Sequence, residues 1–340
     1  MKAIAVTRKL PLDDPELFTA VDLPDPVPGP QDLLIRVKAV SINPVDYKVR
    51  RSRKEEDTEP KILGWDAAGT VEAIGEEVTR FRVGEEVYYA GDITRPGSNA
   101  QYQLVDHRIV AKKPQTLDFE AAAALPLVSI TAWECLFDRL GLKAGDLKEG
   151  KDKVLLILSG AGGVGSIGTQ LAAALTGFTV IATASRPESV SWTQSMGAHH
   201  VVDHSGDWPA QIEALGFSGV DYIACFADTA THWEAMARAI KPQGKICSIV
   251  ESDTIPDLGL LKSKSVTFVW ESMFTRSMFQ TPDMIAQHEL LAEVAQLVDA
   301  GHIRSILRER GGKLTPESLA EAHRAQESGR SIGKRVLTVA

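Results

Sequence analysis

The chain has 340 residues, of which 44% are hydrophobic, and its formal net charge is -8 at pH 7. This length predicts about two domains, and the composition supplies enough apolar side chains for two cores. An acidic balance without long lysine or arginine blocks argues against a nucleic-acid partner, and we expect neither a signal peptide nor a membrane helix. We therefore predict a cytoplasmic protein with no nucleic-acid or membrane partner.

The first 110 residues alternate short apolar runs with turn residues. Runs at 33–40, 69–74 and 101–105 are separated by glycines and prolines, including the stretch PDPVPGP at 24–30. This pattern is typical of a β-rich barrel or sandwich and not of a helical domain.

Strand and helix candidates alternate between Val154 and Trp270, which predicts an α/β fold with a doubly wound parallel sheet. Its last strand, Val266 to Trp270, carries no charge, and an unguarded edge strand invites pairing with a second copy of the chain. We expect a homodimer through this strand. Residues 281–300 read as one amphipathic helix, and the short strands that follow are expected to pack back on the first domain.

A glycine turn lies at the centre of this alternation. Val154 to Leu158 is an apolar run typical of a buried parallel strand, and a helical pattern follows the turn. This order gives the GxGxxG spacing its meaning as a dinucleotide-binding turn. One glycine permits the tight turn, the second lets the backbone approach a pyrophosphate, and the third lets helix and strand pack closely. The residues expected to hold the cofactor here are Gly160, Gly162, Gly163, Val164 and Gly165.

The second strand of the alternation bears on the choice of cofactor. An NAD site usually places an acid roughly 20 residues after the last glycine, and this chain has Ser185 and Arg186 there. A hydroxyl and a guanidinium accept a 2′-phosphate, so we predict NADP(H). The alternative is that Arg186 only begins a surface helix and that both cofactors are accepted. His204, after the third strand, is expected near the adenine.

The chain resembles the medium-chain dehydrogenase/reductase superfamily over nearly its whole length, and within it the zinc-type alcohol dehydrogenase-like branch, which is similar to quinone oxidoreductases. The resemblance implies a GroES-like catalytic domain at 1–126, completed by 275–340, and a Rossmann NADP-binding domain at 127–274. It also implies a dimer. The stretches that carry it, in order, are SINPVDYK, GWDAAGTVEAIG, VGEEVYYAGDITRPGSNAQYQLVD, LPLVSITAWECLFDRLG and LSGAGGVGSIG.

Zinc-containing relatives carry a Cys in the first of these stretches, a His before an acid in the second, and a further Cys or acid before the Rossmann domain. This chain has Asn43, then Trp65 before Asp66, and Pro126, Leu127 or Val128. Zinc needs nitrogen, sulfur or oxygen donors in close array, so we predict no zinc despite the name of the branch.

The resemblance also implies site residues. Asn43 is expected to donate a hydrogen bond near the nicotinamide, Asp46 to orient its neighbours, and Tyr47 to position substrate or donate a proton, with solvent as an equal candidate. Turn capping by Asn43 and core packing by Tyr47 are the alternatives. Further expected cofactor contacts are Thr131, Phe226, Val250, Phe274 and Lys334.

These residues together predict a zinc-independent oxidoreductase that moves a hydride from NADPH to a small-molecule acceptor, which is a quinone, an enone or another activated carbonyl. Without a metal, catalysis relies on positioning and on hydrogen bonds where charge develops. Two alternatives stay open. One is a zinc-type alcohol dehydrogenase or a lyase on the same scaffold, and the other is an NADPH-binding protein without turnover.

Overall fold

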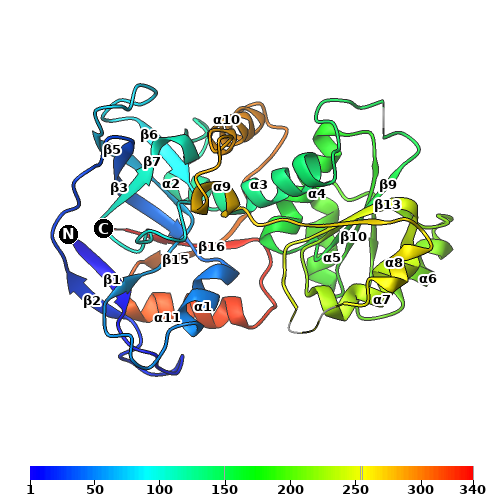
Figure 1. Ribbon diagram of the computed structural model, residues 1–340, viewed down its shortest axis with the longest axis horizontal. Helices are drawn as coiled ribbons and strands as arrows, with labels where there is room; N and C mark the ends of the chain where they lie inside the picture. The colour runs from blue at the N-terminus through cyan, green and yellow to red at the C-terminus, as the bar shows by residue number, and fades with distance from the viewer. Residues whose placement is uncertain (149, 253, 255, 340) are drawn as a thin grey trace. The chain divides into compact units, whose positions relative to one another are not determined.

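Figure 1 shows the computed structural model of the chain, which describes residues 1–148, 150–252, 254 and 256–339. The fold divides into two compact units. Unit 1 comprises Met1–Ile130 and Phe274–Ala340, and unit 2 comprises Thr131–Met273. The division thus falls at 130/131 and 273/274, whereas the sequence predicts it at 126/127 and 274/275.

Unit 1 is built on two β-sheets, as its alternating apolar runs predict. A three-stranded sheet has the order β2-β1-β4, and a seven-stranded sheet has the order β15-β16-β3-β5-β6-β8, with β7 also paired to β3. Their strands are β1 (Lys2–Val6), β2 (Thr19–Asp22), β3 (Asp32–Ser41), β4 (Lys61–Ile62), β5 (Ala67–Ile74), β6 (Glu86–Tyr89), β7 (Tyr102–Asp106), β8 (Val110–Lys112), β15 (Leu307–Lys313) and β16 (Lys334–Thr338).

The long strand β3 organises the larger sheet. Leu33, Ile35 and Val37 are buried, because alternate residues of a strand face the same side. β3 pairs along its length with β5 and β7. At its end it pairs antiparallel with β16, with Ser41 opposite Val336. The end of β3 is therefore enclosed by strands from distant parts of the sequence.

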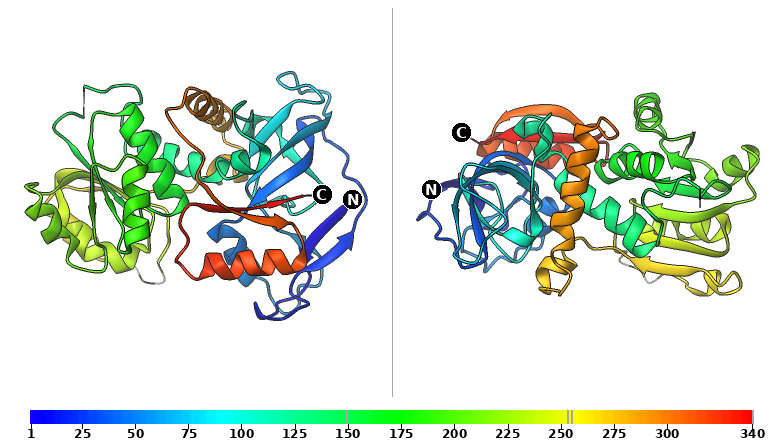
Figure 2. Two further views of the ribbon diagram at one scale, coloured as in Figure 1. Left: turned by 180° about the vertical axis from the view of Figure 1, so that it is seen from behind. Right: turned by 90° about the horizontal axis from the view of Figure 1, so that it is seen from above.

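The C-terminal tail belongs to unit 1, which confirms that it packs back on the first domain. The left view of Figure 2 shows β15, β16 and α11 (Pro316–Glu327), coloured orange to red, among the blue N-terminal elements. α11 packs on α1 (Pro44–Arg51). The unit is completed by the short helices η1 (His107–Ile109), α2 (Phe119–Ala123) and α9 (Thr275–Met278) and by α10 (Ala286–Asp299). The predicted helix over 281–300 thus begins five residues late, since residues 282–285 form turns.

The largely helical stretch Phe119–Arg139, which comprises α2 and the two helical segments after it, is long and apolar enough to cross a membrane by length and composition alone. Its most apolar window is 83% buried inside the structure, which is the behaviour of a core helix in a globular fold. Within it α3 (Pro126–Trp133) continues into η2 (Glu134–Arg139), a segment with π-helical hydrogen bonding.

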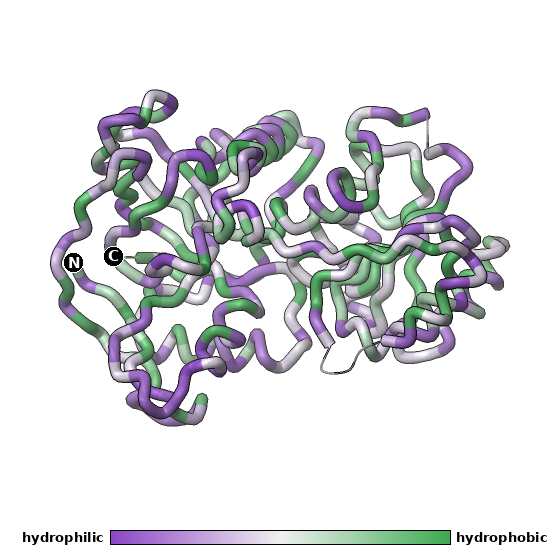
Figure 3. Tube along the Cα trace, in the orientation of Figure 1, coloured by the Kyte–Doolittle hydropathy of each residue, from purple (hydrophilic) through white to green (hydrophobic). Residues whose placement is uncertain are grey.

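Unit 2 is a doubly wound sheet of six parallel strands in the order β11-β10-β9-β12-β13-β14. The strand order reverses between β9 and β12, and ligands of such sheets bind at the carboxyl ends of the strands beside this point. Figure 3 shows the strands of this unit as largely hydrophobic, and every residue of β9 is buried. The elements are β9 (Val154–Leu158), α4 (Gly163–Leu175), β10 (Thr179–Thr183), α5 (Pro187–Ser195), β11 (His200–Val202), α6 (Trp208–Ala214), β12 (Val220–Cys225), α7 (Thr229–Ala239), β13 (Ile240–Ser248), α8 (Gly259–Lys262) and β14 (Thr267–Trp270).

Candidate functional site

The glycine turn joins β9 to α4. Two of its glycines are required by packing within unit 2, and a third leaves space beside the backbone. A Cβ on Gly165 would lie 2.1 Å from the Ser159 carbonyl oxygen, and a Cβ on Gly160 would lie 2.8 Å from Ala182 Cβ. Packing within unit 2 therefore requires glycine at both positions. A Cβ on Gly162 would meet only Ser159, with the nearest atom, Oγ, at 3.3 Å. The fold leaves room there, which fits a backbone kept bare for the approach of a phosphate.

The first turn of α4 presents free donors beside this glycine. The first hydrogen bond within the helix runs from the Ser166 N–H to the Gly162 carbonyl oxygen at 2.8 Å. The N–H groups of Gly163, Val164 and Gly165 precede it and have no partner inside the helix. The first turn contains no acidic residue. The positive end of the helix dipole and these donors together fit a pyrophosphate.

Ser159 and Gly160 tie the turn to the end of β10. Ser159 has a φ of 67°, a left-handed conformation that few residues other than glycine adopt. Its N–H donates to Thr183 Oγ1 at 2.9 Å, and the Gly160 N–H donates to the Thr183 carbonyl oxygen at 2.9 Å. Ser185 and Arg186 follow β10 after one intervening residue, so they lie at the same edge of the sheet as the glycine turn.

Ser185 and Arg186 are both half-buried, and Arg186 is the residue that caps α5. The Arg186 N–H donates to Ser189 Oγ at 3.1 Å, which fixes the start of the helix. The first acid after β10 is Glu188, which is exposed in the first turn of α5. A hydroxyl and a guanidinium therefore occupy the edge where an NAD site would place a carboxylate.

Other predicted cofactor residues of unit 2 lie at this same edge. Phe226 directly follows β12, and its N–H donates to the Leu158 carbonyl oxygen at 3.3 Å. Its ring lies against α4, since a Cβ on Gly168 would be 3.1 Å from it. Val250 follows β13, and Thr131 is a buried residue of α3. Phe226 and Val250 thus join the glycine turn at the carboxyl ends of the parallel strands.

His204 is placed differently. It is exposed after β11 and lines a pocket of about 790 Å³ together with His232, Arg238 and Lys264. Among the described residues that line this pocket, none belongs to the glycine turn. A position of His204 near the adenine therefore stays a prediction.

Four buried polar residues meet at the end of β3 in unit 1, and they are Asn43, Asp46, Asp66 and Lys334. The Asn43 N–H donates to Asp46 Oδ2 at 2.7 Å. Its side-chain amide donates to Asp66 Oδ2 at 3.1 Å and accepts a hydrogen bond from Lys334 Nζ. The Leu127 N–H donates to Asp66 Oδ1 at 3.1 Å. The structure thus brings together three residues that the sequence predicts as site residues, and it adds Asp66. We call these four residues the Lys334 cluster.

Burial shifts the charged members of the Lys334 cluster toward their neutral forms. It raises the pKa of Asp46 to about 7, against the opposing effect of the Asn43 N–H. It raises the pKa of Asp66 to about 6, against the Lys334 ammonium. Burial also lowers the pKa of Lys334, and the opposing effect of the Asp66 and Asp46 carboxylates does not cancel this shift. Burial therefore favours the neutral carboxyl at Asp46 and Asp66 and opposes the charge on Lys334.

The Asn43 amide is engaged within unit 1. Its Nδ2 donates to the Ser41 carbonyl oxygen at 3.4 Å as well as to Asp66, and its Oδ1 faces Lys334. Asn43 thus bridges the acid and the ammonium. The expected donation from this amide to a cofactor would require one of these bonds to break, and it stays a prediction.

Tyr47 and Phe274 lie apart from these hydrogen bonds. Tyr47 is half-buried on α1, and the Arg51 guanidinium lies over its ring at 5.2 Å from the centroid. Among the described residues, no hydrogen bond joins Tyr47 to the Lys334 cluster. Phe274 is buried and meets the Trp65 ring edge-on with centroids 6.4 Å apart. Phe274 is grouped with unit 1, one residue before the predicted boundary at 274/275, and its contact with the cofactor stays a prediction.

The three places where zinc-containing relatives hold their metal converge on Asp66, but they do not form a zinc site. Asn43 offers an amide that is already bonded, and Leu127 offers a backbone donor to Asp66. Trp65 is fully buried, and its indole N–H donates to the Asp92 carbonyl oxygen. Within residues 1–148, 150–252, 254 and 256–339, no group of three His, Cys, Asp or Glu side chains is arranged to hold a metal. The donors present do not fit zinc.

Sequence reasoning missed Asp66 as the partner of Lys334. The available signal was an acid beside Trp65 at the start of an apolar strand, since a buried acid of this kind needs a partner. The partner comes from the far end of the chain, where β16 lies antiparallel to β3. Extending that register by two residues places Lys334 opposite Asn43.

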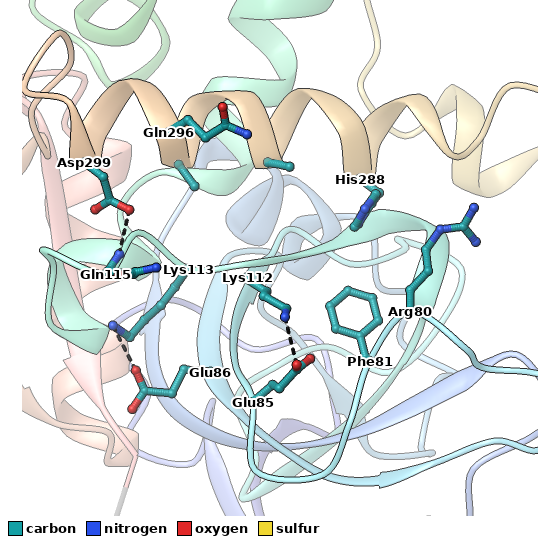
Figure 4. A pocket seen from close by; sticks show the side chains of 12 residues that line it. Arg80, Phe81, Glu85, Glu86, Lys112, Lys113, Gln115, His288, Gln296 and Asp299 are labelled. Carbon is teal, nitrogen blue, oxygen red and sulfur yellow. Dashed lines mark hydrogen bonds and ion pairs between the residues drawn. The ribbon is translucent and has the colours of Figure 1, made fainter.

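Figure 4 shows a second pocket, of about 760 Å³, which α10 and the strands β6 and β8 border. Its charges pair across it, with Lys112 bound to Glu85 and Lys113 bound to Glu86. Among the described lining residues, none is a predicted site residue. This pocket is therefore a surface hollow with mutually compensated charges and not the candidate site.

Comparisons with known proteins agree with this architecture. Residues 29–115 match the alcohol dehydrogenase GroES-like domain, and residues 196–337 match the zinc-binding dehydrogenase family. The chain is similar to a zinc-type alcohol dehydrogenase-like protein of Staphylococcus epidermidis, with 42% identity over 339 residues and all of both chains covered. It is 30% identical to a quinone oxidoreductase of Pseudomonas aeruginosa, with 95% of this chain and 96% of that one covered.

Solved structures show the same likeness. A putative zinc-dependent alcohol dehydrogenase protein from Rhizobium etli superposes with a TM-score of 0.94 at 47% identity, over 99% of this chain and 98% of that one. A mycobacterial protein complexed with NADPH superposes with a TM-score of 0.82 at 27% identity, over 99% of this chain and all of that one. The chain therefore belongs to the medium-chain dehydrogenase/reductase superfamily of oxidoreductases, in which a GroES-like domain is joined to a Rossmann-type nicotinamide-cofactor-binding domain.

Proposed function

We propose that this protein is an NADPH-dependent oxidoreductase that transfers a hydride to a quinone, an enone or another activated carbonyl, without zinc. The observation that carries the proposal is the edge of unit 2 where Ser185 and Arg186 lie beside the glycine turn. A 2′-phosphate gains hydrogen bonds and opposite charge there and meets no carboxylate. The NADPH complex of the similar mycobacterial protein supports this choice of cofactor.

The residues of unit 2 bind and orient the cofactor in this proposal. Gly162 leaves the backbone open, and the first turn of α4 donates to the pyrophosphate. Bound NADPH supplies the hydride. Transfer to an enone or quinone places negative charge on a delocalised oxyanion, which needs less stabilisation than the alkoxide formed from a simple aldehyde. The similar quinone oxidoreductase of Pseudomonas aeruginosa supports an acceptor of this class.

The residues of unit 1 position the groups around the reacting atoms in this proposal. Asp46 is fully buried, and burial raises its pKa to about 7. It contacts the backbone of Asn43 and so orients the residues around it. Tyr47 remains the candidate for positioning substrate or donating the final proton, with solvent as the other candidate.

A steady-state comparison of NADPH with NADH across quinones, enones and aldehydes tests the proposal. We expect NADPH to be preferred by roughly tenfold or more, which is about 1.4 kcal/mol of transition-state binding. Quinones or enones should outpace aldehydes. Equal rates with NADH would refute the interpretation of Ser185 and Arg186. Cofactor binding without oxidation would favour a non-catalytic protein, and activity that requires added zinc would favour a zinc-type alcohol dehydrogenase or a lyase.

We also propose that the protein is a homodimer joined through β14. Among the described strands β14 pairs only with β13, so its outer edge has free backbone groups. Trp270 on this strand is 46% exposed. Light scattering after gel filtration should give twice the mass of one chain, and Val269→Lys should give monomers. A wild-type monomer at micromolar concentration would contradict this assembly.

A further inference from the structure

The Lys334 ammonium is a buried charge with a complete set of partners. Its side chain is 4% exposed at the start of β16. Nζ donates to the Ile42 carbonyl oxygen at 2.8 Å and to Asn43 Oδ1, and it lies 3.3 Å from Asp66 Oδ2. An ammonium has three N–H donors, and three oxygens surround this one. A buried ion is tolerated only when paired and hydrogen-bonded in this way.

The partners of Lys334 are satisfied in turn. Asp66 accepts from the Asn43 amide and from the Leu127 N–H, in addition to its contact with the ammonium. The Asn43 amide is therefore held in one orientation, with its oxygen toward the cation and its nitrogen toward the acid. Removal of the cation would take away the positive charge that favours the ionised forms of Asp46 and Asp66.

The same atoms decide whether a metal can enter. A divalent cation at this place would need the lone pairs of Asp66 Oδ2 and Asn43 Oδ1, which are the oxygens that Lys334 already contacts. It would also lie beside a second positive charge. Metal and ammonium therefore compete for one position.

We propose that Lys334 is the resident cation of this chain: its ammonium neutralises the carboxylates, fixes the Asn43 amide and closes the position to divalent metals. In a family whose matching model is described as zinc-binding, this residue replaces the metal as the source of positive charge. The proposal concerns the protein alone, so it does not depend on which acceptor or cofactor the enzyme uses.

The first test is metal uptake. Wild-type protein and Lys334→Met are dialysed against Co²⁺ or Zn²⁺, and bound metal is counted by mass spectrometry and by the cobalt absorption bands. We expect no stoichiometric metal in the wild type and at least roughly tenfold tighter Co²⁺ binding in Lys334→Met. One tightly bound zinc per wild-type chain would overturn the proposal, and so would equal cobalt uptake by both proteins.

A matched control is available in Lys264. Its Nζ also donates to three oxygens, the carbonyls of Ala237, Arg238 and Ile240, but no carboxylate is among them. Lys264→Met removes an equally bonded ammonium and should gain no affinity for cobalt. A similar gain in this variant would mean that loss of any lysine with three hydrogen bonds opens the protein to metal, which would overturn the assignment.

The second test is charge coupling, and it remains informative if Lys334→Met folds poorly. Lys334→Met and Asp66→Asn should each lower the unfolding temperature by roughly 5–15 °C, because each leaves an unpaired buried charge. The double variant should recover at least half of the summed loss, and Lys334→Arg should stay closer to wild type than Lys334→Met. Strictly additive losses would show that the pair does not act as a unit and would overturn the proposal.

Discussion

In unit 2 the candidate phosphate-binding turn is one short segment, Gly160 to Gly165, whereas in unit 1 the hydrogen-bonded residues Asn43 and Lys334 are 291 residues apart in the sequence. The first arrangement depends on backbone conformation, and the second depends on strand register and on burial of charge. A turn can be recognised from spacing alone. A buried charge cluster becomes visible only when the register of β16 against β3 is known. The two units should therefore respond differently to mutation.

The largest effect is expected from glycines that the fold itself requires. Gly165→Ala would place a methyl group 2.1 Å from a backbone oxygen, so we expect a loss of about 4 kcal/mol or failure to fold. Gly162→Ala should stay within about 1 kcal/mol of wild type in urea unfolding. It should nevertheless weaken NADPH binding by roughly tenfold, measured by calorimetry. Equal losses of stability in both variants would contradict this division of roles.

The next largest effect is the pH dependence of stability that Asp46 causes in unit 1. The pKa of Asp46 is raised by burial from 3.8 to about 7, so its contribution to stability is present below about pH 4 and is lost as the pH rises through 7. Between about pH 4.5 and pH 8, the stability of Asp46→Asn relative to wild type should rise by on the order of 2–3 kcal/mol, measured by urea unfolding.

Asp106 provides a control of opposite sign for this measurement. Burial raises the pKa of Asp106, but hydrogen bonds from Arg108 outweigh burial, so the pKa lies below its ordinary value. The stabilising contribution of Asp106 is therefore present at neutral pH and is lost on acidification. The stability of Asp106→Asn relative to wild type should fall as the pH rises. If the stability of Asp46→Asn relative to wild type also fell as the pH rises, ionisation of Asp46 would not destabilise the folded protein, and the prediction would be wrong.

A smaller effect concerns cofactor choice in unit 2. Ser185→Asp puts a carboxylate at the end of β10, where it repels a 2′-phosphate and accepts hydrogen bonds from ribose hydroxyls. We expect the ratio of kcat/KM for NADPH over NADH to fall by roughly tenfold, or about 1.4 kcal/mol. Ser185→Ala adds no charge and should change this ratio much less. An unchanged ratio in Ser185→Asp would mean that the 2′-phosphate does not bind at this edge of the sheet.

The smallest effect is expected at the charged hollow of Figure 4. The Lys112–Glu85 ion pair is open to solvent, with Lys112 63% exposed, so Glu85→Gln should change stability by no more than about 0.5 kcal/mol. Steady-state activity should be unaffected. A loss of activity in this variant would reveal a role for the hollow that its compensated charges do not suggest.

Much of the fold was predictable because periodicity is local. The strand Val154–Leu158, the glycine turn and the helix after it follow from adjacent residues, and so does the β-rich character of the first unit. The edge position of Ser185 and Arg186 followed from counting along the chain.

The Lys334 cluster was not predictable in the same way. Asn43 and Lys334 were expected at the cofactor, yet the structure binds their side chains to each other and to Asp66. These contacts arise from antiparallel pairing between the two ends of unit 1, and nothing in the local sequence encodes that register. The contact between Trp65 and Phe274 likewise joins distant parts of the sequence and could not be predicted from local pattern.

The pairing of β16 with β3 also has a consequence for biosynthesis. Unit 2 is one continuous segment, Thr131–Met273, so all of it is synthesised before the second segment of unit 1, Phe274–Ala340. Unit 1 cannot close its larger sheet until β16 emerges, because β16 pairs with β3 and is made after the whole of unit 2. Nascent chains therefore carry a finished nucleotide-binding turn well before the acid at Asp66 receives its cation. A chain that stops before Lys334 would lack both the ammonium that contacts Asp66 and the strand that pairs with the end of β3.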